Sequence, residues 1–373
     1  MKRVVGLIGA GVLMVMSVFS VALAQVSSEG NAALTMQAVE AKAERIVSKM
    51  TDEEKVGQLM IIGLQGQEMQ ADTLAMLQKY HVGGVILFDR NMDNKTQVAK
   101  VTKQLQAAAD LPLFICLDQE GGQVARMKTK LLQVPAAETI GQGKLITANQ
   151  YAARCGQELK SIGINVNFAP VVDLGLSRGR SYSRDPEVVT KFAKSVCEGY
   201  ESADIMFCLK HFPGIGKTKV DPHLDPFQIG ASAAELRNED LKPFRELINK
   251  FNDNKFFVMV SHLQYSAFDP EKPASLSTVI MQQLLRKELG FTGLIITDDL
   301  QMGALTKIYP MKELGYRAIA AGSDIALTCH EYANDILVYE GILSALQDGR
   351  LNRQRVDDSV KRVIKTKLLM GFM

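Results

Sequence analysis

The 373-residue sequence predicts an α/β protein whose eight parallel strands close into a TIM-type (β/α)8 barrel, some of them irregular. Short apolar runs alternate with longer amphipathic helical stretches along most of the chain. Polar residues follow many of these runs, whereas an open doubly wound sheet, the alternative fold, would gather them at one switch point. A chain of this length could form two ordinary domains, but α/β barrels routinely need as much sequence for one, and we expect one large domain.

The start of the chain has the pattern of a signal peptide over residues 1–24. Lys2 and Arg3 precede an apolar run at 4–23, and small residues stand at Ala22 and Ala24. An uncleaved membrane anchor is the alternative, because an apolar run of about 20 residues can span a bilayer. Residues 25–35 are small and polar and predict a linker, followed by the barrel domain at 36–373. We therefore expect an exported protein, periplasmic or extracellular, that contacts a membrane only if the signal is uncleaved.

Eight candidate strands follow in order: 57–62, 83–88, 111–117, 165–172, 205–210, 256–262, 293–297 and 324–328. Most are continuously apolar rather than alternating, which indicates strands buried on both faces by covering helices. Asp118, Lys210 and Asp298 each stand at the end of a different run. Because the functional groups of a barrel collect at the carboxyl ends of its strands, these positions predict the site.

The composition excludes several classes of partner and cofactor. Lys plus Arg number 43 and Asp plus Glu 41, so the nearly balanced charge favours no nucleic-acid partner. The five cysteines form no CxxC pair, and we expect them to be buried core residues rather than a zinc site. The cysteine pattern thus indicates no metal site, and we expect a monomer that needs neither metal nor cofactor.

The loop after the fifth strand contains two candidate motifs, a phosphate-binding loop and an acid/base pair, and only the second fits the sequence. Gly216-Lys217-Thr218 has the form of the end of a phosphate-binding loop, but His211 stands where that motif needs a glycine. Asp221 and His223 flank a proline, which favours an extended chain with both side chains on one side. A carboxylate beside an imidazole fixes its tautomer and equips it for proton transfer near neutral pH.

The seventh strand ends abruptly in two carboxylates, Asp298 and Asp299. We expect Asp298 to point into the catalytic mouth, where it can attack an anomeric carbon and form a glycosyl-enzyme intermediate. Asp299 is expected to support the following helix N-terminus. Helix capping alone is the structural alternative for both residues.

From Ile46 onward, the sequence resembles the family-three glycoside hydrolases, in particular the single-domain exo-β-N-acetylglucosaminidases of bacterial cell-wall turnover. The resemblance is carried by Lys210-His211-Phe212-Pro213-Gly214 with Asp221-x-His223, by Ile296-Thr297-Asp298-Asp299-Leu300, and by Asp118-Gln119-Glu120-Gly121-Gly122. It implies that Asp298 is the nucleophile of a retaining β-N-acetylhexosaminidase and that the His223-Asp221 dyad is its acid/base. It further implies that Asp118, Arg180, Lys210 and His211 hold the hydroxyls of the terminal sugar.

Four residues depart from the family pattern: Ile215 replaces the usual His, Lys217 an Asp or small residue, Gln123 an Arg and Pro222 a Ser. They bear on loop mobility, rate and substrate fit, and they suggest that Lys217 docks an anionic or larger aglycone. The alternatives are a β-glucosidase-like relative, a sugar phosphorylase, and a sugar-binding protein that has lost catalysis. The retained Asp298, Asp221 and His223 favour the hydrolase.

Overall fold

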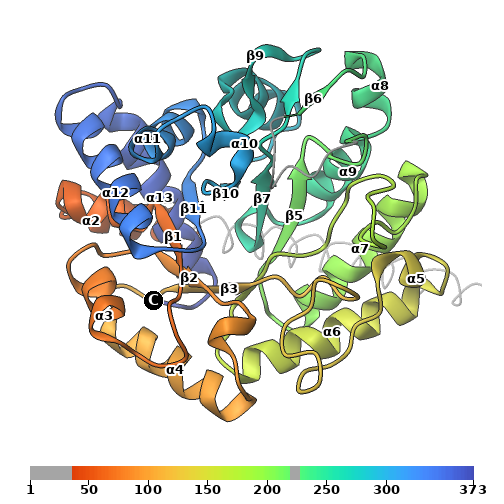
Figure 1. Cartoon of the computed structure of the whole chain (residues 1–373), viewed down its shortest axis with the longest axis horizontal. Coiled ribbons are helices and arrows are strands. Elements are labelled where there is room, and N and C mark those ends of the chain that lie inside the picture. Colours follow the sequence, from red (N-terminus) through yellow and green to blue (C-terminus); the bar gives the residue numbers. More distant parts are fainter. Residues whose placement is uncertain (1–35, 219–226) are drawn as a thin grey trace, which may run out of the picture. The chain divides into compact units, whose positions relative to one another are not determined.

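The computed structural model describes residues 36–218 and 227–373 (Figure 1). The predicted signal peptide, the predicted linker and the pair Asp221 and His223 lie outside these residues. The chain divides into two units, Met1–Lys49 and Met50–Met373. A helix at 36–47 belongs to the first unit, and the second unit contains every strand.

Eight parallel strands of the second unit form one sheet that closes on itself, so the predicted barrel is confirmed. The sheet order is β4-β3-β2-β1-β11-β10-β7-β5, and parallel bridges from Val166 to Met206 and from Val171 to Lys210 join its two outer strands. The strands are β1 (Met60–Gly63), β2 (Gly84–Ile86), β3 (Phe114–Leu117), β4 (Val166–Asn167), β5 (Phe207–Phe212), β7 (Phe256–Val260), β10 (Leu294–Asp299) and β11 (Ile325–Thr328).

The predicted strand bounds differ from the observed ones by one or more residues; the third strand, predicted over 111–117, begins only at Phe114, and two other differences have identifiable reasons. The first predicted strand began at residue 57, but residues 57 and 58 end helix α2 (Asp52–Gln58). Thr51 and Glu54 form a reciprocal capping box that starts this helix and commits the following residues to it. The fourth strand was predicted over 165–172 and is regular only at Val166–Asn167. Pro170 has no N–H to contribute to a strand ladder.

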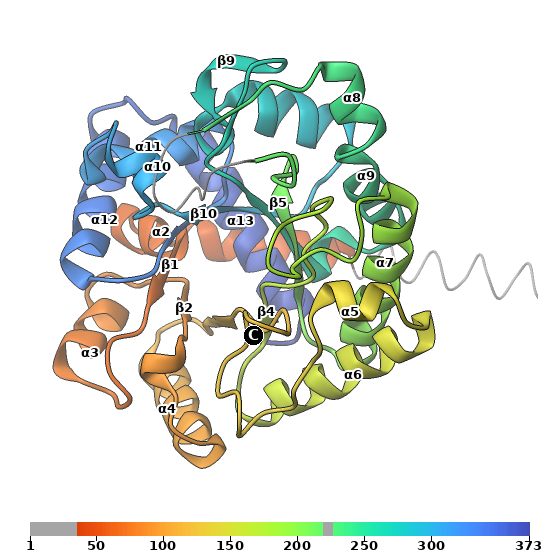
Figure 2. The same cartoon turned by 45° about the vertical axis from the view of Figure 1, so that its right-hand side comes forward.

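Helices surround the strands in both views of the barrel unit (Figures 1 and 2). They are α3 (Ala71–Gln78), α4 (Lys95–Ala108), α5 (Ala137–Gly141), α6 (Leu145–Ser161), α7 (Pro186–Ser202), α8 (Ala233–Asn238), α9 (Leu241–Lys250), a π-helical segment η4 (Val279–Glu288), α10 (Gly303–Thr306), α11 (Met311–Ala321), α12 (Tyr332–Gln347) and α13 (Arg353–Leu369). Short helical turns lie at η1 (Asp89–Asn91), η2 (Asp253–Lys255) and η3 (Ala274–Leu276), and a small sheet joins β6 (Gln228–Ile229), β8 (Gln264–Tyr265) and β9 (Asp269–Pro273). Over residues 36–218 and 227–373, no helix has both the length and the apolar character that crossing a bilayer demands.

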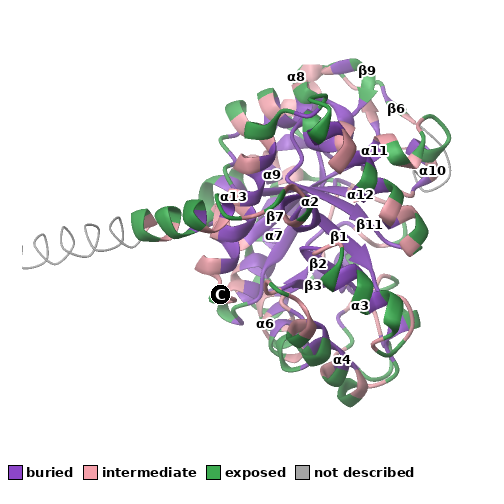
Figure 3. Ribbon diagram, turned by 90° about the vertical axis from the view of Figure 1, so that its left-hand side faces the viewer, coloured by how far each residue is buried: buried purple, intermediate pink, exposed green. Residues whose placement is uncertain are grey.

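The strand side chains that point inward fill the barrel, and Figure 3 shows the strands buried inside helices whose outer faces are exposed. Phe114, Phe168 and Phe257 meet edge to face within this core. Phe372, after α13, packs against the same cluster. All five cysteines are free and buried, as predicted, and burial raises the pKa of the Cys208 thiol.

Lys367 of α13 is fully buried without a carboxylate partner among the described residues. Its Nζ donates to Gln58 Oε1 at 2.7 Å and to the Gly83 carbonyl at 3.1 Å, and it lies over the Phe114 ring. Burial disfavours the charged amine and lowers its pKa from 10.5 to about 7. The unfolded chain therefore binds an additional proton between about pH 7 and pH 10.5.

We expect the free energy of unfolding to rise with pH across this window relative to that of a Lys367→Met variant. The pKa of Lys367 is lower in the folded state, so the cost of its burial is complete below pH 7 and disappears toward pH 10.5. The difference should change by roughly 2–4 kcal/mol. Urea unfolding at pH 7, 8.5 and 10 measures it. The exposed Lys250→Met variant is the control, and parallel curves for wild type and Lys367→Met would refute the expectation.

Candidate active site

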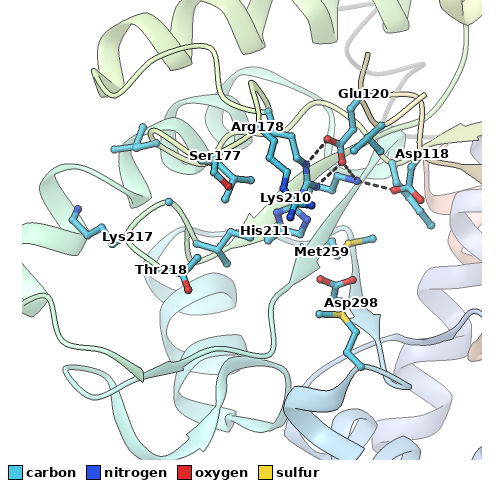
Figure 4. A pocket seen from close by; sticks show the side chains of 18 of the residues that line it. Asp118, Glu120, Ser177, Arg178, Lys210, His211, Lys217, Thr218, Met259 and Asp298 are labelled. Atoms are coloured by element: carbon cyan, nitrogen blue, oxygen red, sulfur yellow. Dashed lines mark hydrogen bonds and ion pairs between the residues drawn. The ribbon is translucent and has the colours of Figure 1, made fainter. Parts of the chain in front are cut away.

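A cavity of about 1650 Å³ opens at the carboxyl ends of the barrel strands. Its walls include Asp118 after β3, Lys210 and His211 at the end of β5, and Asp298 at the end of β10. The loop after β4 adds Arg180. The five sequence-predicted residues that the structure describes are thus brought together in one cavity. Figure 4 labels Asp118, Lys210, His211 and Asp298 among them.

Four charged side chains form a continuous network on one side of the cavity. Lys210 Nζ lies 2.7 Å from Asp118 Oδ1 and 2.7 Å from Glu120 Oε1. Arg180 holds both oxygens of Glu120 at 2.8 Å in a bidentate pair. Figure 4 shows the contacts of Lys210 with Glu120 and Asp118 as dashed lines. The geometry fixes the Lys210 ammonium and the Asp118 carboxylate at the cavity wall, where they can bind hydroxyl groups.

The charges of this network stabilise one another despite their burial. Burial alone would raise the pKa of Glu120, but Lys210 and Arg180 outweigh it and lower that pKa to about 2. Burial would likewise lower the pKa of Lys210, whereas Asp118 and Glu120 hold it above its ordinary value. Both groups therefore remain charged across the range in which enzymes work.

Asp173 positions His211 and the turn that follows β5. Its side chain is completely buried, and its Oδ2 lies 2.7 Å from His211 Nδ1. The backbone N–H groups of His211 and Ile215 donate to the same carboxylate, at 3.2 and 2.8 Å. When Nδ1 donates to Asp173, the Nε2 atom of His211 is the ring nitrogen left for a ligand in the cavity.

Asp298 faces the cavity and accepts a hydrogen bond of 2.8 Å from the backbone N–H of Asp299. Burial alone would raise its pKa, but the charges of His211 and His262, this hydrogen bond and Lys210 together lower it from its ordinary value. An ionised carboxylate in a cavity that also presents an ammonium and an imidazole can act as a nucleophile or stabilise a cation.

The neighbours of Asp298 have structural contacts. Asp299 Oδ1 accepts from the backbone N–H of Gln301 at 3.0 Å, in the turn that precedes α10, as expected of a supporting residue. Its Oδ2 lies 3.2 Å from His330 Nε2, and His330 lines the cavity. His262 is buried behind Asp298 and binds Ser275 and the carbonyl of Asp299.

Lys217 lines the cavity, but it does not present a free cation there. Its Nζ lies 2.5 Å from Asp240, 2.8 Å from Glu239 and 3.4 Å from Glu235. The Asp240 carboxylate is completely buried, so it requires this partner. The suggestion that Lys217 docks an anionic aglycone is therefore not supported, because its charge compensates side chains of α8 and the α8–α9 junction.

Sequence reasoning missed Glu120, Arg126 and Asp173 as organisers of the cavity. Arg126 Nη2 donates to Asp118 Oδ2 at 3.1 Å and so fixes the oxygen that Lys210 does not contact. Glu120 and Asp173 each follow an apolar strand, and this position is the local signal that could have identified them. The charged partners of Glu120 and Asp173 lie 38 to 90 residues away along the chain.

Within residues 36–218 and 227–373, no group of three or more His, Cys, Asp or Glu side chains is arranged to hold a metal ion. Lys210, Arg180 and Arg126 all donate to carboxylates beside the cavity. Together with His211 and Asp298, these groups offer donors and acceptors suited to a polyhydroxylated ligand.

The chain matches the family described as "Glycosyl hydrolase family 3 N terminal domain" over residues 51–366. It is 36% identical to "Beta-hexosaminidase A" of Pseudoalteromonas piscicida over 326 residues, 78% of this chain and 54% of that protein. It is also 36% identical to the "Beta-hexosaminidase" of Stenotrophomonas maltophilia strain R551-3 over 283 residues, 73% of this chain and 83% of that protein. The chain thus spans about half the length of the first relative.

Solved structures show the same similarity. A glycoside hydrolase family 3 β-N-acetylglucosaminidase from Paenibacillus sp. str. FPU-7 superimposes with a TM-score of 0.83 and 35% identity, covering 86% of this chain and 63% of that one. A family 3 glycosyl hydrolase from Mycobacterium smegmatis gives a TM-score of 0.78 and 30% identity, covering 86% of this chain and 98% of that one.

Proposed function

The chain belongs to glycosyl hydrolase family 3, and from this membership we propose that it is an exo-acting β-N-acetylhexosaminidase. Its proposed reaction removes terminal β-linked N-acetylglucosamine from peptidoglycan fragments or related glycans. The observation that carries the proposal is an ionised Asp298 in a cavity that Lys210, Asp118 and Arg180 also line. Relatives named β-hexosaminidase support the choice of an acetamido sugar.

In this proposal Asp298 is the nucleophile of a retaining mechanism. Its carboxylate attacks the anomeric carbon while the glycosidic oxygen leaves, and a glycosyl-enzyme ester forms. Water then cleaves the ester and returns the β-anomer. The lowered pKa of Asp298 keeps the attacking oxygen ionised, and Asp118, Lys210, His211 and Arg180 are proposed to hold the hydroxyls of the terminal sugar.

His223, paired with Asp221, is proposed to protonate the leaving oxygen and later to take a proton from the attacking water. Both residues lie outside the described part of the chain, and the support for their roles is the sequence resemblance. Lys210 and His211 stand at the end of β5, the strand that precedes them in the sequence. The signal-peptide pattern of residues 1–24 supports the further proposal that the protein is exported to the periplasm or beyond.

The proposed function is tested with p-nitrophenyl β-N-acetylglucosaminide and the matching β-glucoside as substrates for the whole chain. We expect preferential hydrolysis of the acetamido sugar and a product whose first anomer, followed by proton NMR, is β. In the His223→Ala variant, p-nitrophenyl release should be lost far more than release of the better leaving group 2,4-dinitrophenol. Faster hydrolysis of the glucoside, or an α-anomer formed first, would refute the proposal.

The acid limb of the kcat/KM profile is expected to lie below pH 3.8, the ordinary pKa of an aspartic acid. Asp298 must be ionised to attack, and His211, His262 and Lys210 lower its pKa in the free enzyme. The 2,4-dinitrophenyl glycoside is the suitable substrate, because its departure needs no proton from His223. Initial rates at low substrate, taken on enzyme shown to remain folded at each pH, measure the limb, and an apparent pKa above 4 would contradict this expectation.

A further inference from the structure

The cavity continues beyond the region that the terminal sugar is proposed to occupy. At about 1650 Å³ it exceeds the range of roughly 300–1000 Å³ that is common for small-ligand pockets. In Figure 4, Lys217 and Thr218 lie on one side of Lys210, and Glu120 and Asp118 lie on the other. If the non-reducing sugar occupies the end near Asp118, the remaining cavity is available to the aglycone.

Six lysine and arginine side chains line the cavity, and they divide into two classes. Four are compensated by carboxylates: Arg126, Arg180, Lys210 and Lys217. The other two, Arg178 and Arg184, have no ion pair or side-chain hydrogen bond with any residue in 36–218 or 227–373. Both are exposed, and both belong to the loop between β4 and α7.

This loop holds its shape through internal contacts. Ser181 Oγ accepts from the Gly175 N–H at 2.9 Å and lies 2.6 Å from the carbonyl of Asp173. Asp173 is also the residue that binds His211. Hydrogen bonds through Asp173 therefore connect the backbone of the loop to His211, which is proposed to contact the terminal sugar. They hold the backbone that carries Arg178 and Arg184 in place at the cavity wall.

We propose that Arg178 and Arg184 form an aglycone subsite that recognises a carboxylate. A guanidinium with unused donors can bind a carboxylate bidentately, and its positive potential is stronger in a concave wall than on an open surface. Glu235 and Glu239 also line the cavity; they lie 3.4 and 2.8 Å from Lys217 and share its single positive charge with Asp240. The inference rests on the proposed function, since in peptidoglycan the sugar that follows N-acetylglucosamine carries a lactyl carboxylate.

The test compares two aryl β-N-acetylglucosaminides of equal size, one with a carboxylate on the aglycone and one with the corresponding carboxamide. The measured quantity is the ratio of their kcat/KM values. It should favour the carboxylate in the wild-type protein, fall about tenfold in Arg178→Ala and in Arg184→Ala, and fall with added salt. Arg154→Ala is the matched control, because Arg154 is exposed on α6 and does not line the cavity. An unchanged ratio in the Arg178→Ala/Arg184→Ala double variant would overturn the inference.

A binding measurement separates this inference from the proposed function. If neither glycoside is hydrolysed, the proposed function fails, and calorimetric titration with N-acetylmuramic acid and its amide decides the inference. The acid should bind the wild-type chain at least fivefold more tightly than the amide, and the double variant should lose this preference. Equal affinities of the wild-type chain for acid and amide would overturn the subsite.

Discussion

The Asp298→Ala variant should retain no more than about one thousandth of the wild-type kcat on p-nitrophenyl β-N-acetylglucosaminide. The substitution removes the only atom that can form the glycosyl-enzyme ester in the proposed mechanism, while Lys210, Asp118 and His211 remain to bind the sugar. KM is therefore expected to change much less than kcat. Steady-state kinetics on purified protein, with wild-type contamination excluded, measures the loss.

Azide provides a test of the chemistry that a merely misfolded variant would fail. With Asp298 shortened to alanine, a small anion can enter the vacated space and attack the anomeric carbon of the 2,4-dinitrophenyl glycoside directly. One displacement inverts the configuration, so the product should be the α-glycosyl azide. A β-azide, or undiminished activity in Asp298→Ala without azide, would exclude Asp298 as the nucleophile.

The barrel was predictable because its strands are buried on both faces and their sequences are accordingly apolar up to the polar residues at their carboxyl ends. The pattern does not determine where a strand stops. Pro170 limits β4 through a missing N–H, and the capping of α2 by Thr51 takes two residues from the first predicted strand. The proline and the helix cap each act over a few residues, whereas the apolar pattern used to predict the strands extends beyond these residues. The pattern alone therefore predicts strands that are too long.

The candidate site was predictable only to the extent that strand ends identify it. Asp118, Lys210 and Asp298 stand directly after apolar runs, and the structure places them in one cavity. The residues that hold them are less visible in sequence. Glu120 acquires its importance from Arg180, which is 60 residues away, and such a pairing depends on the closed barrel rather than on any local pattern.

The role of Lys217 was also mispredicted because its ion-pair partners are not visible in the local sequence. As a sequence departure it suggested a free cation for an aglycone, but α8 and the α8–α9 junction supply three carboxylates that compensate it. Arg178 and Arg184, which no motif distinguishes, are the cavity-lining cations without such partners in the described residues. Charge compensation across the fold therefore decides which cations are available to a carboxylate of the substrate.

The Glu120→Gln variant should lose at least about a hundredfold in kcat/KM and roughly 3–5 kcal/mol in the free energy of unfolding. The carboxylate is nearly buried and shares its charge between Lys210 and Arg180, at 2.7 and 2.8 Å. Glutamine keeps the size of the side chain but removes its negative charge. Lys210 and Arg180 are then left with Asp118, whose single charge is shared with Arg126. Lys210 is then free to turn fully toward Asp118, which alters the groups that are proposed to bind the sugar.

Two measurements separate the catalytic loss from the stability loss. Because the pKa of Glu120 is about 2, its stabilising charge is present above the ordinary glutamic acid pKa of 4.5 and is lost as the pH falls toward 2. The stability difference between wild type and Glu120→Gln should therefore be constant from pH 5 to 8 and shrink below pH 4.5. The matched control is Glu187→Gln, whose exposed ion pair with Lys242 should contribute little to the free energy of unfolding. If Glu120→Gln unfolds like Glu187→Gln and keeps its kcat/KM, the buried network does not organise the site, and the cavity must bind its sugar through other groups.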